Sequence, residues 1–165
     1  MKKIAVILSI LLILISCGGF EFIYKTNKNN FLLTNNMNIN ANGDNDSEIR
    51  VLLTDIFGNN ESDPKYKLIV NSSRTKTAAV INKDGTASKF NIQYIASYDL
   101  YNLYKNCKTF HKEINTISFY NPKSAGYSFG TGFSEKESNI QNLNKNLNEF
   151  VAFLNTQATL DNCLE

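Results

Sequence analysis

KFNIQYIASYDL, residues 89–100, decides the fold class, because it carries the most regular hydrophobic pattern in the chain. Apolar side chains recur at every second position, and Ile95 alone falls out of phase. The apolar set is Phe90, Ile92, Tyr94, Ala96, Tyr98 and Leu100. A period of two predicts an antiparallel β-strand with one buried face and one face in water. The sheet that contains this strand therefore needs a covering layer on one side.

The neighbouring segments predict two more strands that continue the sheet as a meander. Residues 65–81 begin with polar-apolar alternation, and the Asp-Gly pair that follows them favours a tight hairpin turn. A third strand is predicted over residues 107–120. Its apolar positions run to Ile114 and resume out of phase at Ile117, so we expect a β-bulge near Asn115.

Helical periodicity appears on both sides of the meander. Residues 48–58 (EIRVLLTDIFG) place apolar side chains on one face of a short helix that ends at a glycine. A longer helix is predicted over 134–156, with Ser134 as N-cap and Glu137 completing a capping box. Its apolar stripe is Ile140, Leu143, Leu147, Phe150, Val151 and Leu154. Residues 31–39 alternate and predict a further strand.

These elements predict an α+β fold in the order β-α-β-β-β-α. Each helix has a single apolar face and the sheet has one wet face, so the economical arrangement is a two-layer sandwich. About four mostly antiparallel strands form one layer, and the two amphipathic helices cover one face of the sheet. We expect a single domain over residues 31–165.

The N-terminus has the pattern of a bacterial lipoprotein signal peptide. Lys2 and Lys3 precede an apolar run over residues 4–15, which is too short to span about 30 Å of hydrocarbon. The run closes with Leu-Ile-Ser-Cys-Gly over residues 14–18, which looks like a lipobox. We therefore expect cleavage after residue 16. An ordinary secretory signal with an incidental cysteine is the alternative.

Cys17 is the expected lipid anchor, because its thiol can carry a diacylglycerol and cleavage frees an amine for a further acyl chain such as palmitate. Two or three chains make membrane attachment stable. Residues 17–30 then form a lipidated tether. The loss of Lys2 and Lys3 leaves 15 basic and 15 acidic residues, so a generic electrostatic grip on nucleic acid is disfavoured.

Cys107 and Cys163 are the two other cysteines, and export to an oxidising compartment permits a bridge between them. At about 1.5 Å per residue, the last helix travels roughly 33 Å back along the preceding strand. The end of the helix should therefore return near Cys107, and we predict a Cys107–Cys163 disulfide.

No constellation of residues predicts catalysis, a metal site or another cofactor. The only histidine, His111, lies in the third strand of the meander, where a surface position is the simplest interpretation. Glu135 and Glu137 suit the N-terminus of a helix better than they suit an acid–base pair. The abundant asparagines are interpreted as the product of an AT-rich genome. Basic residues gather on the first long hairpin: Lys65, Lys67, Arg74, Lys76, Lys83 and Lys89.

The order of several motifs resembles that of the LPS-assembly lipoprotein family (LptE, also called RlpB) in its alphaproteobacterial form. Residues 17–24 (CGGFEFIY) look like the family's Cys-Gly-Phe-x-Pro-Leu-Tyr start, with one extra glycine and with Phe22 where proline is usual. Residues 48–58 resemble its Leu-Arg-x-x-Leu helix. Residues 96–100 resemble its Ala-x-Tyr-x-Leu strand, and residues 117–121 resemble its Ser-Tyr-Asn strand end.

This resemblance implies a non-enzymatic outer-membrane lipoprotein on the periplasmic side. Family members plug the LptD β-barrel, bind lipopolysaccharide and assist its transport and assembly at the cell surface. Gly18 after the anchor is consistent with sorting to the outer membrane. Within the basic hairpin, Arg74 and Lys76 are the residues we expect to contact lipopolysaccharide phosphates.

Two other functions remain open at this point. The chain could be a structural envelope lipoprotein, or an accessory subunit of another outer-membrane assembly complex. It could also be a small lipid-modifying hydrolase, which requires a serine–histidine pairing around His111.

Overall fold

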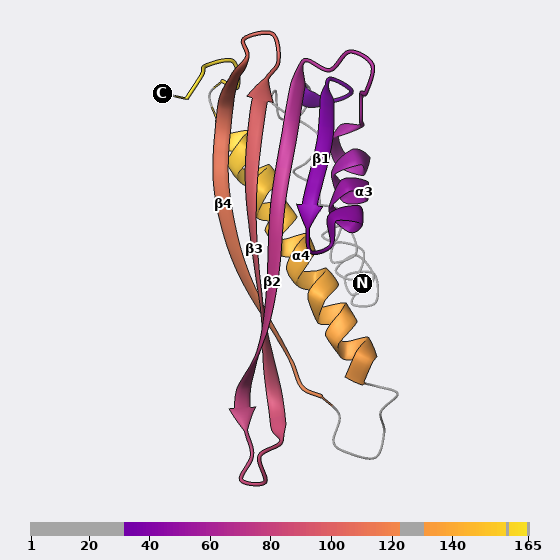
Figure 1. The fold of residues 1–165 in the computed structure, drawn as a ribbon, viewed down its shortest axis with the longest axis vertical. Helices are drawn as coiled ribbons and strands as arrows, with labels where there is room; N and C mark the ends of the chain where they lie inside the picture. The colour runs from indigo at the N-terminus through magenta and orange to yellow at the C-terminus, as the bar shows by residue number, and fades with distance from the viewer. Residues whose placement is uncertain (1–31, 123–130, 158, 165) are drawn as a thin grey trace, which may run out of the picture.

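The computed structural model describes residues 32–122, 131–157 and 159–164, with side chains from Ser134 onward in the second range. The elements follow the predicted order (Figure 1), and the α+β class is confirmed. They are β1 (Met37–Gly43), α3 (Asp46–Phe57), β2 (Tyr66–Ile81), β3 (Ala87–Asn102), β4 (Cys107–Tyr120) and α4 (Thr131–Thr156). The predicted signal peptide, the lipid anchor and the tether lie outside the described residues.

The four strands form one sheet in the order β1-β2-β3-β4. β2, β3 and β4 are antiparallel neighbours, as the meander predicts, whereas β1 lies parallel to β2. A parallel neighbour requires a crossover connection, and α3 provides it between β1 and β2. α3 lies beside β1, and α4 crosses the sheet diagonally behind β3 and β4 (Figure 1). Buried side chains from both helices and the sheet form one hydrophobic core.

The first strand begins later than the sequence predicts. β1 starts at Met37, and the residues before it form a short helical turn that ends at Asn35, whose φ is 56°. The Asn35 amide donates to the Phe57 carbonyl at 2.8 Å, so this segment packs against the end of α3. Leu33 is fully buried there. Leu33 is therefore apolar because it packs at the end of a helix, and the strand prediction for residues 32–36 is wrong.

The predicted β-bulge near Asn115 is also wrong. The register of β4 against β3 is continuous from Phe110 to Tyr120 and is interrupted at Thr109, which faces the step from Leu100 to Tyr101. Because the phase does not change, Ile117 and Phe119 lie on the outer face of the sheet, 44% and 54% exposed. The helix-facing positions between them carry polar side chains.

Two asparagines of α4 occupy the resulting polar seam between the helix and the sheet. Asn146 is fully buried, accepts a 2.7 Å hydrogen bond from the Tyr98 hydroxyl and donates to the Ile114 carbonyl at 3.0 Å. Asn142 donates to the Ile92 carbonyl at 2.9 Å. Buried amides need such partners, because an unpaired one costs about 1–3 kcal/mol. Genome composition therefore does not account for these two asparagines, which fasten α4 to the sheet.

The long helix also differs at its start from the sequence prediction. α4 begins at Thr131, so Ser134 lies inside the helix and is not its N-cap. The predicted stripe is buried except for Ile140, which is 42% exposed. A capping box is a local sequence signal, and it misplaced the start of the helix by three residues. α4 begins before Ser134, closer in the chain to the end of β4.

The chain after α4 is held at the end of the sheet that begins β2 and β4. Cys107 and Cys163 form a disulfide bond, with their Cα atoms 5.7 Å apart. Asp161 accepts a 2.7 Å hydrogen bond from the Tyr66 hydroxyl and forms an ion pair with Lys65 at 3.3 Å. These contacts attach the C-terminal segment to β2 and β4.

The polar seam makes a testable contribution to stability. We expect Tyr98→Phe to lower the free energy of unfolding by about 1–3 kcal/mol, because it removes the donor to a fully buried amide oxygen. Urea unfolding of the soluble mature chain measures the change. Tyr104→Phe is the matched control, since Tyr104 is 69% exposed. Equal losses in the two variants would refute a special role for the seam.

The disulfide makes a second prediction. The denatured, non-reduced mature chain should show no maleimide labelling at Cys107 or Cys163, and labelling should appear after reduction. A cross-link between residues 56 positions apart removes enough chain entropy to stabilise the fold by roughly 4 kcal/mol. Cys163→Ser should therefore unfold at a clearly lower urea concentration. Full labelling without reductant would contradict the bridge.

Candidate functional site

The predicted anion-binding residues Arg74 and Lys76 lie in β2, on the face of the sheet that the helices cover. The register pairs Arg74 with Tyr94 and Lys76 with Ile92. Directly opposed residues of an antiparallel pair point to the same face, and Tyr94 and Ile92 are fully buried on the helix side. Lys76 lies near the start of α4, because its ammonium pairs with Glu135 of that helix, and Arg74 lies two residues away on the same face of β2.

Lys76 is held in a small aromatic and ionic cluster at this end. Its ammonium lies 2.6 Å from the Glu135 carboxylate, which also accepts a 2.8 Å hydrogen bond from the Tyr120 hydroxyl. The ammonium lies 4.6 Å from the ring centroid of Phe90 and 5.3 Å from that of Tyr120. The two rings stack with centroids 5.4 Å apart. β2, β3, β4 and α4 each contribute one residue to this cluster.

The ion pair shifts both partners toward their charged forms. The hydrogen bond from Lys76 holds the pKa of Glu135 below its ordinary value, and the hydrogen bond to Glu135 raises the pKa of Lys76. Burial raises the pKa of the Tyr120 phenol. Lys76 therefore already has a carboxylate partner, and an incoming phosphate must compete with Glu135 for it.

Arg74 is the cation of the pair that remains open to a ligand. Its backbone amide donates to the Asp44 carboxylate at 2.7 Å, which fixes the strand at this point. Its side chain is exposed, and no carboxylate among the described residues forms an ion pair with the guanidinium. A guanidinium can donate two parallel hydrogen bonds to a phosphate or carboxylate.

The six basic residues of the hairpin do not form one patch. Lys65 pairs with Asp161 at the opposite end of the sheet from the hairpin turn. Lys67 also lies near that end, because it pairs with Tyr101. Lys89 lies 4.5 Å from the ring centroid of Phe119, on the outer face of the sheet. Lys83 lies in the turn between β2 and β3. Of the six residues, Arg74 and Lys76 are therefore the two that lie beside each other near the start of α4.

Glu135, Phe90 and Tyr120 are the members of the cluster that the sequence did not assign to the site. Glu135 is predicted as a charge that suits a helix N-terminus, and nothing in its local sequence names Lys76 as its partner. Phe90 and Tyr120 are predicted strand residues. Their juxtaposition depends on the register of three strands, in which Phe90 lies opposite both Ala78 and Tyr120.

His111 lies on the outer face of β4 and is exposed. Its Nδ1 lies 2.7 Å from the Asp99 carboxylate, which also pairs with Lys108 at 2.8 Å. Burial opposes ionisation of Asp99, but the hydrogen bonds from Lys108 and His111 prevail and lower its pKa.

The described ranges contain no cluster of three or more metal-ligating side chains. They also contain no helix that is long and apolar enough to cross a membrane.

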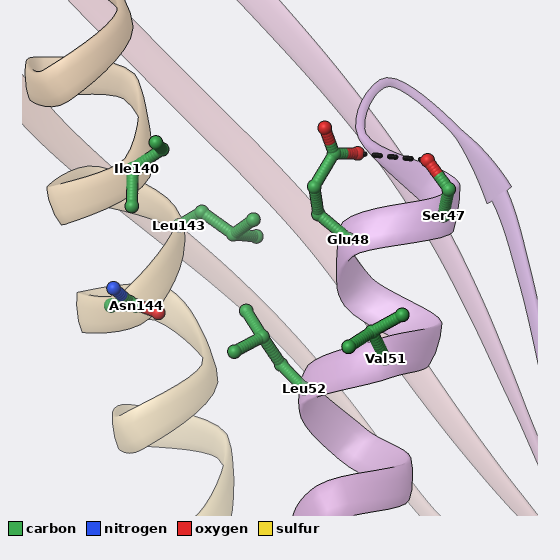
Figure 2. A pocket seen from close by; sticks show the side chains of 7 residues that line it. All are labelled: Ser47, Glu48, Val51, Leu52, Ile140, Leu143 and Asn144. Carbon is green, nitrogen blue, oxygen red and sulfur yellow. Dashed lines mark hydrogen bonds between the residues drawn. The ribbon is translucent and has the colours of Figure 1, made fainter.

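A second surface feature, which the sequence did not predict, is an apolar groove between α3 and α4. Figure 2 shows Leu52 from α3 facing Leu143 from α4, and Val51 and Ile140 line the same groove. The groove has a volume of about 420 Å³, and Ser47, Glu48 and Asn144 complete its lining. The sequence shows that Val51 and Ile140 are apolar, but only the packing of the two helices shows that they line the same groove.

The fold can be compared with proteins of known structure. No family model matches the sequence, and no curated protein does. The structure is similar to a "putative lipoprotein" from Caulobacter crescentus CB15, with a TM-score of 0.60 and 15% sequence identity. The similarity covers 78% of this chain and 93% of that chain. This chain has the fold of a bacterial lipoprotein.

Two further solved structures are more distant. Rare lipoprotein B from Shewanella oneidensis has a TM-score of 0.44 at 14% identity, with 72% of this chain and 96% of that chain covered. A minor lipoprotein from Acinetobacter baumannii has a TM-score of 0.38 at 13% identity, with 65% and 78% covered.

The ion pair in the cluster predicts an acid-dependent loss of stability. The pKa of Glu135 is lowered in the folded protein, so its contribution is present above its ordinary pKa of 4.5 and is lost as the pH falls through the lower folded value. Glu135→Gln should lower the free energy of unfolding by about 0.5–1 kcal/mol at pH 7, a small amount because the ion pair is partly exposed. At pH 3 the same substitution should change the free energy of unfolding very little.

Urea unfolding at the two pH values measures the difference between variant and parent. Glu137→Gln is the matched control, because Glu137 lies in the same part of α4 and is exposed. A pH-independent cost for Glu135→Gln would show that the ion pair does not cause the effect.

Proposed function

We propose that this chain is an outer-membrane lipoprotein that plugs and supports an LptD-type β-barrel and assists lipopolysaccharide assembly. The observation that carries the proposal is the fold, because a β-α-β-β-β-α sandwich similar to a Caulobacter lipoprotein follows a lipobox-like sequence at Cys17. The motif order that resembles the LptE family supports the same function. A protein of this kind acts by fitting and bracing a partner, and the proposal includes no enzymatic step.

The outer face of the sheet has the chemistry that suits the inside of a barrel. Barrel interiors are polar, so a plug needs a polar surface with few unpaired charges. The outer face carries the neutral polar side chains Asn91, Gln93, Ser97 and Asn115. It also carries Asp99, whose charge is paired with Lys108 and His111, and the exposed apolar residues Ile117 and Phe119. Gln93 and Asn115 hydrogen-bond to each other at 3.2 Å across the strands. Neither helix covers this face, so it is available to a partner (Figure 1).

Within this function, Arg74 is the proposed contact to a lipopolysaccharide phosphate, and Lys76 supports it. The Arg74 guanidinium has no competing carboxylate among the described residues, whereas the Lys76 ammonium is shared with Glu135. A phosphate placed between the two cations gains charge-assisted hydrogen bonds, each worth more than a neutral one. The partly exposed ring of Phe90, which stacks on the buried ring of Tyr120, offers an apolar contact to the glycolipid.

Co-purification tests the barrel partnership. The acylated protein, extracted in mild detergent through a C-terminal affinity tag, should bring down one large β-barrel in a ratio of about one to one. Mass spectrometry identifies the partner, and a lipoprotein of unrelated fold carrying the same tag is the control. Recovery alone, with peptidoglycan or with another assembly complex would instead support the structural-lipoprotein alternative.

Lipopolysaccharide binding is tested separately from the barrel. Arg74→Ala should weaken binding of purified lipopolysaccharide roughly tenfold, because it removes a charge-assisted contact. Lys67→Ala is the matched control, because it removes one cation from the same strand at the other end. Equal affinities for the parent and the Arg74 variant would remove Arg74 from the proposed site.

A further inference from the structure

The groove between α3 and α4 exposes large aliphatic side chains that ordinarily gain from burial. Val51 is 60% exposed and Ile140 is 42% exposed, although they lie close to the fully buried Leu53 and the nearly buried Leu143. Figure 2 shows Leu52 and Leu143 directed into the space between the helices, and Val51 and Ile140 also line the groove. Covering a surface of this kind stabilises a protein by about 25 cal/mol for each Å² removed from water. The described residues leave the groove open to solvent.

We infer that the groove is the docking site of this chain's own N-terminal tether, through the aromatic run Phe20-Glu21-Phe22-Ile23-Tyr24. Three aromatic side chains alternate in this run, so an extended backbone directs them to one side. Val51, Leu52, Ile140 and Leu143 form an apolar surface that fits them.

The length of the tether allows it to reach the groove. The described chain starts at Leu32, and the Asn35–Phe57 hydrogen bond places this start at the C-terminal end of α3. α3 has 12 residues and is therefore about 18 Å long, and the groove lies along its N-terminal half. The eight peptide steps from Tyr24 to Leu32 span up to about 27 Å when extended. The run can therefore lie along α3 without strain.

The charges of the two surfaces are complementary. Glu48 lines the groove, and Asp46 and Asp55 also lie on exposed positions of α3. The tether carries Lys25 and Lys28 directly after the aromatic run. Opposite charges at the rim of an apolar contact favour one orientation of the docked segment.

Docking of the tether orients the protein relative to the membrane. Cys17 lies three residues before Phe20, so its lipid is held within about 10 Å of the groove. The anchor then leaves from the helix layer, and the outer face of the sheet points away from the attachment point. This inference concerns the chain alone and does not depend on which partner covers the outer face.

A photo-crosslinker placed at position 51 tests the docking directly. Benzoylphenylalanine replaces Val51 in the acylated full-length protein, and after irradiation the crosslinked peptides are identified by mass spectrometry. We expect an intramolecular product that contains residues 20–24. The same probe at position 50 is the matched control, because Arg50 is exposed on α3 but does not line the groove. Its yield of this product should be at least tenfold lower.

Variants of the tether separate docking from chance proximity. Phe22→Ser should reduce the product at position 51 at least tenfold, whereas Glu21→Ser, in the opposite phase, should leave it unchanged. Equal yields from positions 50 and 51, or a yield insensitive to Phe22→Ser, would overturn the inference. Crosslinks from position 51 mainly to a second copy, to lipid or to another protein would overturn it as well, and would identify the true occupant.

Discussion

The buried contact between Tyr98 and α4 is the interaction on which the rest of the structure depends. The Tyr98 ring stacks on Phe150 with centroids 4.1 Å apart, and its hydroxyl donates to Asn146 at 2.7 Å. Hydrophobic packing alone lets a helix slide along a sheet with little change in energy. A paired amide does not, because a shift of one residue leaves a buried donor and acceptor unpaired. The contact therefore fixes the register of α4.

Both ends of the molecule follow from that register. At the start of α4, Glu135 forms an ion pair with Lys76 and accepts a hydrogen bond from Tyr120. These contacts attach this end of the helix to β2 and β4. Beyond its end, the chain returns to Cys107 through the disulfide, and Asp161 meets Lys65 and Tyr66. Because the helices cover one face of the sheet, the outer face is the surface that the proposed barrel partner contacts. The proposed function as a lipid-anchored support inside a larger pore needs this division of surfaces.

Local sequence signals predicted most elements and failed where a tertiary contact outweighed them. The alternation in β3 predicted the strand correctly, because every second residue of β3 faces the same hydrophobic core. The strand prediction failed before Met37, because Leu33 is buried against the end of α3 and not in the sheet. Ile117 and Phe119 wrongly predicted a bulge, because they are apolar but lie on the outer face of β4, where polar residues are expected. For the candidate site, the sequence predicted the cations Arg74 and Lys76, but it did not predict that the Glu135 carboxylate forms an ion pair with Lys76.

The sequence by itself determined the α+β class and the element order, because periodicity and turn residues are properties of neighbouring positions. The lipid anchor at Cys17 is a prediction from the signal-peptide pattern. The tertiary structure alone decided the parallel placement of β1, the role of the buried asparagines and the groove between α3 and α4. Each of these depends on residues far apart in the chain. A side chain's local pattern shows whether it is polar, but only its packing partners decide whether that polarity is buried, paired or left open to a ligand.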